Sequence, residues 1–206
     1  MFCFLKLRRF LYLISPNKIR KSFYKDLEDV LSSNKVKYFQ IRLKKYSKSK
    51  VIKISKKIKK ITKKYNVKLI INDLPLLAKK VNDDGCHLGQ FDGSIKKCRL
   101  LLKNKIIGIT CHGSKKLILK AIKDKPNYIA IGSFFKSKLK PNAKKAQKNL
   151  IKWTKRRTNL PLVAIGGINN KNYKSLIRFG INYLALSSYI WNNPRFKPNK
   201  AIKEFN

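Results

Sequence analysis

Acidic residues are scarce in this sequence: nine Asp and Glu stand against 51 Lys and Arg, which gives a formal net charge of +42. Such a charge is typical of proteins that bind nucleic acid or anionic membranes, but clustering is the more informative sign. Here the lysines are spread over all the helix-like segments. A dispersed charge indicates a solvated surface whose positive field attracts small anions. We therefore expect small anionic molecules as partners, and no specific nucleic acid.

Closely spaced cysteines and long apolar runs are also missing. The four cysteines form no CxxC pair, so neither a zinc site nor a redox pair is indicated, and buried free thiols in a reducing compartment are expected. No stretch reaches the roughly 18 apolar residues that a membrane span needs. The apolar segment 2–13 is broken by Lys6, Arg8 and Arg9, unlike a signal peptide. These features predict a cytoplasmic chain with no membrane partner.

Eight short apolar runs alternate with segments of helical periodicity. The predicted strands are 11–15, 37–43, 68–71, 85–88, 105–110, 127–132, 160–166 and 182–187. The predicted helices are 22–31, 49–65, 74–81, 94–102, 114–122, 143–156, 170–179, a turn from 188 and a tail of 199–205. This alternation is typical of a parallel sheet covered on its outer face. Eight strands can close without an edge, and no GxGxxG follows the first one. We therefore expect an α/β protein, a single-domain (β/α)₈ TIM barrel over residues 1–206 with its core at about 11–192.

Two carboxylates follow neighbouring predicted strands: Asp73 after 68–71 and Asp92 after 85–88. Because parallel strands end on one rim, where ligands of such folds bind, both carboxylates are expected at the same mouth. In a chain with so few acids, they indicate a hard cation whose coordination shell is completed by a polyphosphate. The alternative is that each carboxylate only caps the helix that follows it.

Other polar groups are expected at the same rim. Gln40, Arg42 and Lys44 are two positions apart and point to one side if the strand persists that far. The further candidates are Asn72, Gln90, Thr110, Ser137, Lys140, Gly166–Gly167 and Ser187–Ser188. Together with the two carboxylates, these cations, hydroxyls and amides predict a metal-bridged pyrophosphate site.

A second, simpler phosphate site is predicted near the C-terminus. Gly166 and Gly167 precede a helix, so the backbone can approach an anion at a helix N-terminus. Phosphate sites after strands 7 and 8 recur in barrels, and Ser187 and Ser188 follow strand 8. An ordinary loop is the alternative. The two histidines, His87 and His112, are interpreted as structural, hydrogen-bonded imidazoles.

A family resemblance rests on several of these segments. They are Gln40-Ile-Arg-Leu-Lys44, Ile71-Asn-Asp73, Asp84-Gly-Cys-His-Leu-Gly-Gln-Phe-Asp92, Ile107-Gly-Ile-Thr110, Ala164-Ile-Gly-Gly-Ile168 and the serine after strand 8. In this order they resemble thiamine phosphate synthase, of the thiamine monophosphate synthase and thiazole tautomerase superfamily. The resemblance spans 11–190. The loop after 127–132 departs from the family pattern, since Ser133 replaces a proline and Leu139 a threonine.

The resemblance implies a (β/α)₈ enzyme that joins an aminopyrimidine methyl pyrophosphate to a thiazole phosphate and releases pyrophosphate. It implies that Asp73 and Asp92 hold Mg²⁺ and that Gln40 contacts the pyrimidine. It assigns the pyrophosphate to Arg42, Lys44, Asn72, Thr110 and Lys140, of which all but Asn72 are expected to be catalytic. It assigns the thiazole phosphate to Gly167 and Ser188, while Ser137 and Ser187 are further substrate-binding candidates. The family reaction is dissociative, so it needs charge stabilisation and no side-chain nucleophile.

Two other functions are weighed against this one. A thiazole tautomerase of the same superfamily would need an acid–base histidine near the strand-6 loop, and none follows His112. A basic nucleic-acid-binding protein would show salt-sensitive, sequence-indifferent binding, but no binding motif is present. The sequence leaves open whether the chain forms a homo-oligomer.

Overall fold

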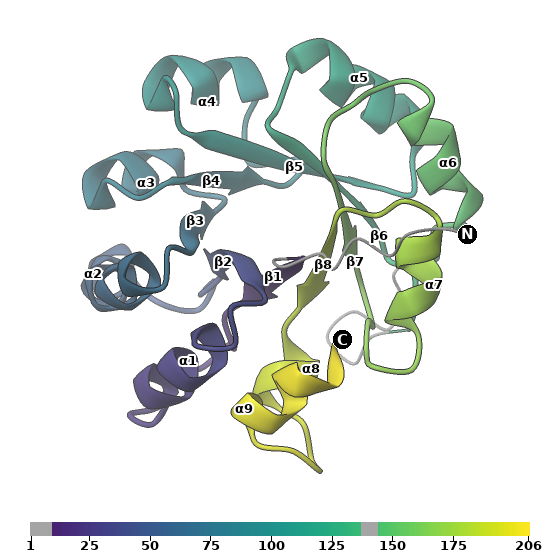
Figure 1. Ribbon diagram of the computed structural model, residues 1–206. Coiled ribbons are helices and arrows are strands. Elements are labelled where there is room, and N and C mark those ends of the chain that lie inside the picture. The colour runs from purple at the N-terminus through teal and green to yellow at the C-terminus, as the bar shows by residue number, and fades with distance from the viewer. Residues whose placement is uncertain (1–9, 137–143) are drawn as a thin grey trace.

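Eight parallel strands close into a barrel, and the helices form a ring around it (Figure 1). This is a computed structural model, and it describes residues 10–136 and 144–206. The strands are β1 (Leu11–Ile14), β2 (Val36–Ile41), β3 (Lys68–Asn72), β4 (Gly85–Leu88), β5 (Ile106–His112), β6 (Tyr128–Gly132), β7 (Leu162–Ile165) and β8 (Tyr183–Leu186). Each strand pairs with its sequence neighbours, and pairing of β1 with β8 closes the barrel. The predicted (β/α)₈ architecture is confirmed.

The helices follow the prediction closely in the first half of the chain and less closely in the second. They are α1 (Phe23–Leu31), α2 (Lys48–Lys64), α3 (Pro75–Val81), α4 (Ile95–Leu102), α5 (Lys115–Asp124), α6 (Asn149–Lys155), α7 (Tyr173–Arg178), α8 (Ser188–Trp191) and α9 (Pro198–Ala201), with a final 3₁₀ turn, η1 (Ile202–Glu204). The prediction of a helix from 143 was wrong, because α6 begins at Asn149. Helix α7 also begins three residues late, because the Asn169 side chain accepts hydrogen bonds from the backbone of Lys171 and Asn172 and holds a turn there.

Alternation along the strands creates two apolar layers. In β1, Leu11 and Leu13 belong to the large cluster that also contains the buried faces of the helices, whereas Tyr12 belongs to a smaller second cluster. That second cluster, with Tyr128, Ala130, Val163 and Ala185, fills the barrel interior. Because successive strand residues point to opposite sides, one strand serves both layers. The interior is thus packed below the C-terminal ends of the strands.

A glycine makes room for the largest interior side chain. A Cβ added at Gly108 would lie 1.9 Å from Cζ and 2.3 Å from the hydroxyl oxygen of Tyr128, whose ring is fully buried. No side chain could be accommodated there without moving that ring. Gly108 on β5 therefore sets the position of the Tyr128 hydroxyl in the barrel.

We expect Gly108→Ala to destabilise the protein by about 1–3 kcal/mol, because overpacking a dense core forces side chains from their preferred rotamers. Urea unfolding followed by circular dichroism measures the loss. The same substitution in a Tyr128→Ala background should cost clearly less, since the clashing ring is gone. Equal losses in both backgrounds would show that the clash is not the cause.

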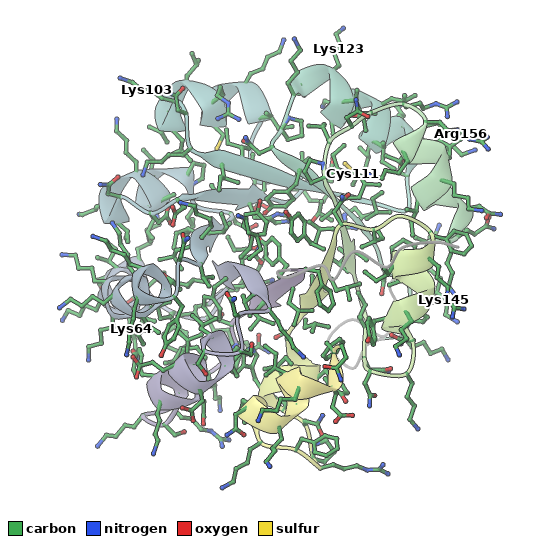
Figure 2. The ribbon with its side chains drawn as sticks, in the orientation of Figure 1. Lys64, Lys103, Cys111, Lys123, Lys145 and Arg156 are labelled. Atoms are coloured by element: carbon green, nitrogen blue, oxygen red, sulfur yellow. The ribbon has the colours of Figure 1, made fainter. Side chains whose placement is uncertain are left out.

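The positive side chains cover the outside of the barrel. Lys64, Lys103, Lys123, Lys145 and Arg156 extend from different sides of the ring of helices (Figure 2). In the part of the chain that the structure describes, three ion pairs occur: Lys44–Asp73, Lys64–Glu28 and Lys68–Asp84. Most of the cations therefore face solvent without a carboxylate partner.

The structure bears on the predictions made for the cysteines and for membrane-spanning segments. Cys86, Cys98 and Cys111 are free and buried, as expected, and Cys3 lies outside the described ranges. Within residues 10–136 and 144–206, no helix has the length and apolar character needed to cross a bilayer.

Candidate active site

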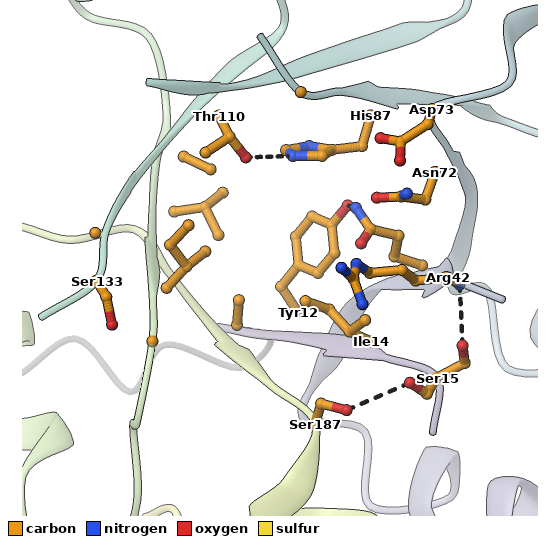
Figure 3. Close-up of a pocket in the computed structure, with 18 of the residues that line it drawn as sticks. Tyr12, Ile14, Ser15, Arg42, Asn72, Asp73, His87, Thr110, Ser133 and Ser187 are labelled. Atoms are coloured by element: carbon orange, nitrogen blue, oxygen red, sulfur yellow. Dashed lines mark hydrogen bonds between the residues drawn. The ribbon is translucent and has the colours of Figure 1, made fainter. Parts of the chain in front are cut away.

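A cavity of about 320 Å³ opens at the C-terminal ends of the strands. Its lining comes from all eight strands or the loops that follow them. The predicted site residues in this lining are Gln40, Arg42, Lys44, Asn72, Asp73, Asp92, Thr110, Gly166 and Ser187. Figure 3 shows Asn72, Asp73 and His87 on one side of this pocket and Ser133 on the opposite side. The side chains predicted to share one rim are therefore brought together.

The cationic side of the cavity begins where β2 ends. Strand β2 stops at Ile41, so Arg42 and Lys44 lie beyond it and not on the strand, where alternation alone would have placed them. The backbone N–H of Arg42 donates to the Ser15 hydroxyl at 2.9 Å, which ties this segment to the end of β1. The Arg42 guanidinium points into the pocket (Figure 3). The orientation of Arg42 therefore depends on this hydrogen bond to the end of β1 and not on alternation along β2.

The two predicted carboxylates lie next to each other. Asp73 has a left-handed backbone (φ 63°), its N–H donates to the His87 carbonyl at 2.8 Å, and its side chain forms an ion pair with Lys44 at 2.8 Å. Asp92 accepts from the Gly89 N–H at 2.9 Å and is within hydrogen-bonding reach of Asp73. Neither is a helix cap, since Leu74 is the N-cap residue of α3, and Ser94 caps α4. The capping alternative is therefore wrong for both residues.

The pKa values of Asp73 and Asp92 are shifted in opposite directions. Burial and the neighbouring Asp73 carboxylate raise the pKa of Asp92 above its usual value. Burial alone would raise the pKa of Asp73, but hydrogen bonds from Lys44 and Asp92 outweigh this effect and lower the pKa. Two close carboxylates repel each other when both are ionised, and a proton or a cation between them relieves that repulsion. The arrangement is suited to binding positive charge.

The space between these carboxylates fits a small cation. A Cβ added at Gly89 would lie 2.4 Å from Asp92 Oδ2 and 3.9 Å from Asp73 Oδ1, so glycine leaves this cradle open. Two protein carboxylates with the remaining ligands from water and phosphate are the usual environment of Mg²⁺. Within the described residues, no group of three or more His, Cys, Asp and Glu gathers that could form an all-protein metal centre. The donor set therefore favours a hard ion that also binds a ligand oxygen.

The glycine pair after β7 forms the opposite wall. Gly166 and Gly167 have positive φ values of 95° and 64°. A Cβ on Gly167 would lie 2.2 Å from the Lys136 carbonyl oxygen, so the loop after β6 packs directly on this backbone. Gly166 lines the cavity, whereas Gly167 and Ser188 are not in its lining; Ser188 is exposed at the start of α8. Ser187 lines the cavity and donates to the Ser15 carbonyl at 3.3 Å.

Two predicted residues cannot be placed. Ser137 and Lys140 lie outside the described residues, and their roles stay predictions.

Gln90 is positioned by a hydrogen bond to the Thr110 carbonyl. His112 ends β5 at a bulge and lines the cavity.

The interpretation of the sequence missed two tyrosines in the floor of the cavity. Tyr12 and Tyr128 are buried, and their hydroxyls are 2.7 Å apart. Tyr128 also bonds His87 Nδ1 at 2.8 Å, so His87 is a hydrogen-bonded barrel residue as predicted. A signal was present: Tyr12, Tyr38, Tyr128 and Tyr183 all occupy inward positions of their strands. These tyrosines were counted only as apolar strand residues, so their hydroxyl groups were overlooked.

A third perturbed carboxyl lies far from this mouth, between α3 and β4. Asp83 is 3% exposed; its Oδ1 accepts from the Gly85 N–H at 3.1 Å, while its Oδ2 has no hydrogen-bond partner among the described residues. Burial raises the pKa of Asp83 to about 8, in spite of the nearby Lys105. The folded protein therefore favours the protonated acid at neutral pH.

The stability of the protein should consequently fall as pH rises from about 4 to about 8, because the unfolded chain releases the Asp83 proton near pH 4 and the folded chain retains it to about 8. We expect Asp83→Asn to remove this part of the slope, an effect of a few kcal/mol at pH 8.5. Urea unfolding of both proteins at pH 5 and pH 8.5 measures it, with the exposed Asp29→Asn as control. Parallel pH profiles for wild type and Asp83→Asn would contradict the assignment.

Comparison with known proteins agrees with this geometry. Residues 11–190 match the family model described as thiamine monophosphate synthase. The chain is 53% identical over 198 residues to a thiamine-phosphate synthase of Pelagibacter ubique, covering 96% of each protein, and 37% identical to one of Erythrobacter litoralis, covering 94% of this chain and 93% of that protein. Among solved structures it resembles thiamine phosphate pyrophosphorylase from Pyrococcus furiosus, with a TM-score of 0.84, 25% identity and coverage of 96% and 93%. The chain belongs to the thiamine monophosphate synthase family.

Proposed function

We propose that this chain couples an aminopyrimidine methyl pyrophosphate with a thiazole phosphate, giving thiamine phosphate and pyrophosphate. The observation that carries the proposal is the convergence of Arg42, Lys44, Asp73 and Asp92 on one cavity. Its relatives are named for this activity. The cavity combines cations for a diphosphate with carboxylates for a metal ion, which is what departure of a highly charged group requires.

The cationic wall would bind the diphosphate. Arg42 supplies a planar array of donors that suits phosphate oxygens, and Lys44 adds a mobile point charge. Asn72 and Thr110 line the same cavity and supply neutral donors. As the carbon–oxygen bond to the diphosphate lengthens, negative charge gathers on the leaving group, and these donors stabilise it more than they stabilise the bound substrate. Lys140 is proposed to add a further cation from the loop after β6.

Asp73 and Asp92 would hold Mg²⁺ in the cradle beside Gly89. When bound there, Mg²⁺ supplies additional positive charge to the diphosphate oxygens. The role of the chain is to fix the carboxylates: Asp92 through the Gly89 N–H and Asp73 through its backbone bond to His87. The Lys44 ammonium, which pairs with Asp73 at 2.8 Å, is thereby kept next to the expected diphosphate position.

The second substrate would enter from the opposite wall. Gly166 and Ser187, which line the cavity on this side, would provide donors for a single phosphate, and Gly167 and Ser188 follow them directly in the sequence. Ser137 is proposed to join them. Gln40, 3% exposed at the cavity floor, would bind the pyrimidine ring. The two rings would then meet between the walls, where positioning replaces any covalent intermediate with the protein.

The test is product formation by the purified protein. With Mg²⁺ and both substrates, thiamine phosphate and one equivalent of pyrophosphate should appear, and EDTA should stop the reaction. A tautomerase would isomerise the thiazole phosphate without pyrophosphate release, and a nucleic-acid-binding protein would shift duplex DNA at moderate salt. Thiazole isomerisation, or DNA binding without any thiamine phosphate, would overturn the proposal.

A further inference from the structure

A continuous chain of hydrogen bonds crosses the floor of the cavity. Gln40 Nε2 donates to the Tyr12 hydroxyl at 2.9 Å, and this hydroxyl is 2.7 Å from that of Tyr128. Tyr128 is 2.8 Å from His87 Nδ1, and His87 Nε2 is 2.7 Å from Thr110 Oγ1. The first four of these residues are buried, and Figure 3 shows the last contact. We name this chain the relay; all five of its residues line the cavity.

Each link of the relay has a direction, because every member between the ends must donate one proton and accept another. When Gln40 presents Nε2 to Tyr12, Tyr12 donates to Tyr128 and Tyr128 donates to His87 Nδ1. His87 then carries its proton on Nε2 and donates it to Thr110. The Thr110 hydroxyl proton is left for an acceptor in the cavity.

Rotating the Gln40 amide by half a turn reverses every link. Tyr12 then donates to Gln40 Oε1, His87 carries its proton on Nδ1, and Thr110 donates inward to Nε2. Thr110 now offers the cavity only lone pairs. A mixture of the two directions leaves either a buried hydroxyl proton without an acceptor or two neighbouring oxygens with no proton between them, so the relay has two favoured states.

We propose that the relay makes Thr110 a phosphate donor only when Gln40 recognises an amino group on the pyrimidine ring. An N–H donor from the ligand binds Gln40 Oε1 and holds Nε2 against Tyr12, which directs the Thr110 proton outward to the diphosphate. A ring with an oxo group at that position favours the opposite amide orientation and turns the Thr110 proton inward. Tyr12, Tyr128 and His87 are thus positioning residues that couple recognition of the ring to binding of the leaving group.

Other features support a relay of neutral groups. The two ring nitrogens of His87 each face a hydroxyl, Tyr128 at Nδ1 and Thr110 at Nε2, so the tautomer of His87 reports the direction of the relay. Burial raises the pKa of Tyr12 and Tyr128, which keeps both hydroxyl protons in place. The His87 and Tyr128 rings stack with centroids 5.6 Å apart, and the space left by Gly108 lets the Tyr128 hydroxyl reach the imidazole.

The direct test is the tautomer of His87, read from ¹⁵N NMR of protein labelled at its two histidines. With Mg²⁺, pyrophosphate and the aminopyrimidine methanol bound, His87 should carry its proton on Nε2; with the oxo analogue it should carry it on Nδ1. In Tyr128→Phe the tautomer should no longer depend on the ligand. The same tautomer with both ligands in the wild type would overturn the inference.

The coupling can also be measured as a binding cycle. Saturating aminopyrimidine methanol should tighten pyrophosphate binding at least about fivefold in the wild type, and by less than about twofold in Tyr128→Phe. Tyr12→Phe breaks a different link of the relay and should also reduce the coupling to less than about twofold. It serves as the test if Tyr128→Phe does not fold. Tyr173→Phe, which removes a hydroxyl bonded to Asn206 outside the relay, should retain wild-type coupling.

The inference rests on the proposed function, but the two fail differently. If neither the pyrimidine nor pyrophosphate binds the wild type, the proposed function fails and the relay with it. If both bind and thiamine phosphate forms, yet Tyr128→Phe and Tyr12→Phe keep full coupling, only the relay is wrong.

Discussion

Replacing Asp92 with asparagine is expected to lower kcat at least about 100-fold while the barrel stays folded. Asparagine keeps an oxygen for the Gly89 N–H but removes one of the two negative charges proposed to hold Mg²⁺. Loss of one strong electrostatic contribution to a charged transition state commonly costs 100- to 1,000-fold. Stability should change little, since the substitution also removes the repulsion between Asp92 and Asp73.

Two measurements separate this effect from general damage. Mg²⁺ with pyrophosphate should raise the melting temperature of the wild type, because a ligand that binds only the folded state stabilises it, and this shift should vanish in Asp92→Asn. Asp29→Asn removes a carboxylate from the exposed face of α1 and should leave both activity and shift intact. Wild-type turnover in Asp92→Asn would rule out the proposed metal role.

Arg42→Gln is expected to reduce kcat/KM by about 100-fold or more. The half-buried guanidinium lies in the cavity and has no carboxylate partner in the described part of the chain, so its charge is available to the diphosphate. Glutamine retains a donor but not the charge, and the loss should be larger for the reaction than for the binding of pyrophosphate, because charge on the leaving group grows along the reaction path.

The control for Arg42→Gln is Arg178→Gln, which removes the same charge from the exposed end of α7. In a protein of net charge +42, one distant charge contributes little to the overall field, so Arg178→Gln should stay within about twofold of wild type. Steady-state kinetics and a pyrophosphate displacement titration on both variants measure the difference. Equal losses in the two variants would indicate that only the general field matters.

The fold could be predicted because each strand is short, apolar and followed by a helix, and this periodicity is local. The error at α6 has a physical reason: residues 144–148 have helix-forming composition but are held by contacts such as the Ala146 N–H to the Ser133 carbonyl, 2.8 Å. A contact between the two ends of the connection from β6 to α6 overrode local helix propensity. Helical periodicity carries no sign of such a contact.

The site was predictable to the extent that barrel topology brings strand ends together. Asp73 and Asp92 follow consecutive strands, so their proximity follows from the fold alone. Arg42 reached the cavity by another route than expected, through the Ser15 hydroxyl, because β2 ends before it. The relay could not be inferred, since hydrogen bonds among Tyr12, Tyr128 and His87 depend on the depth at which each side chain sits. Only the register of the strands determines that depth.

Few of the surface cations in the described part of the chain have a carboxylate partner, and this has a consequence for the conditions in which this enzyme works. Like charges spread over a small globule push it apart, so dissolved ions should make the fold more robust by weakening that repulsion. The same ions compete for the cavity and shield the diphosphate from the field that draws it in. Folding and substrate capture therefore favour opposite ionic strengths, and the best turnover is expected at a compromise between them.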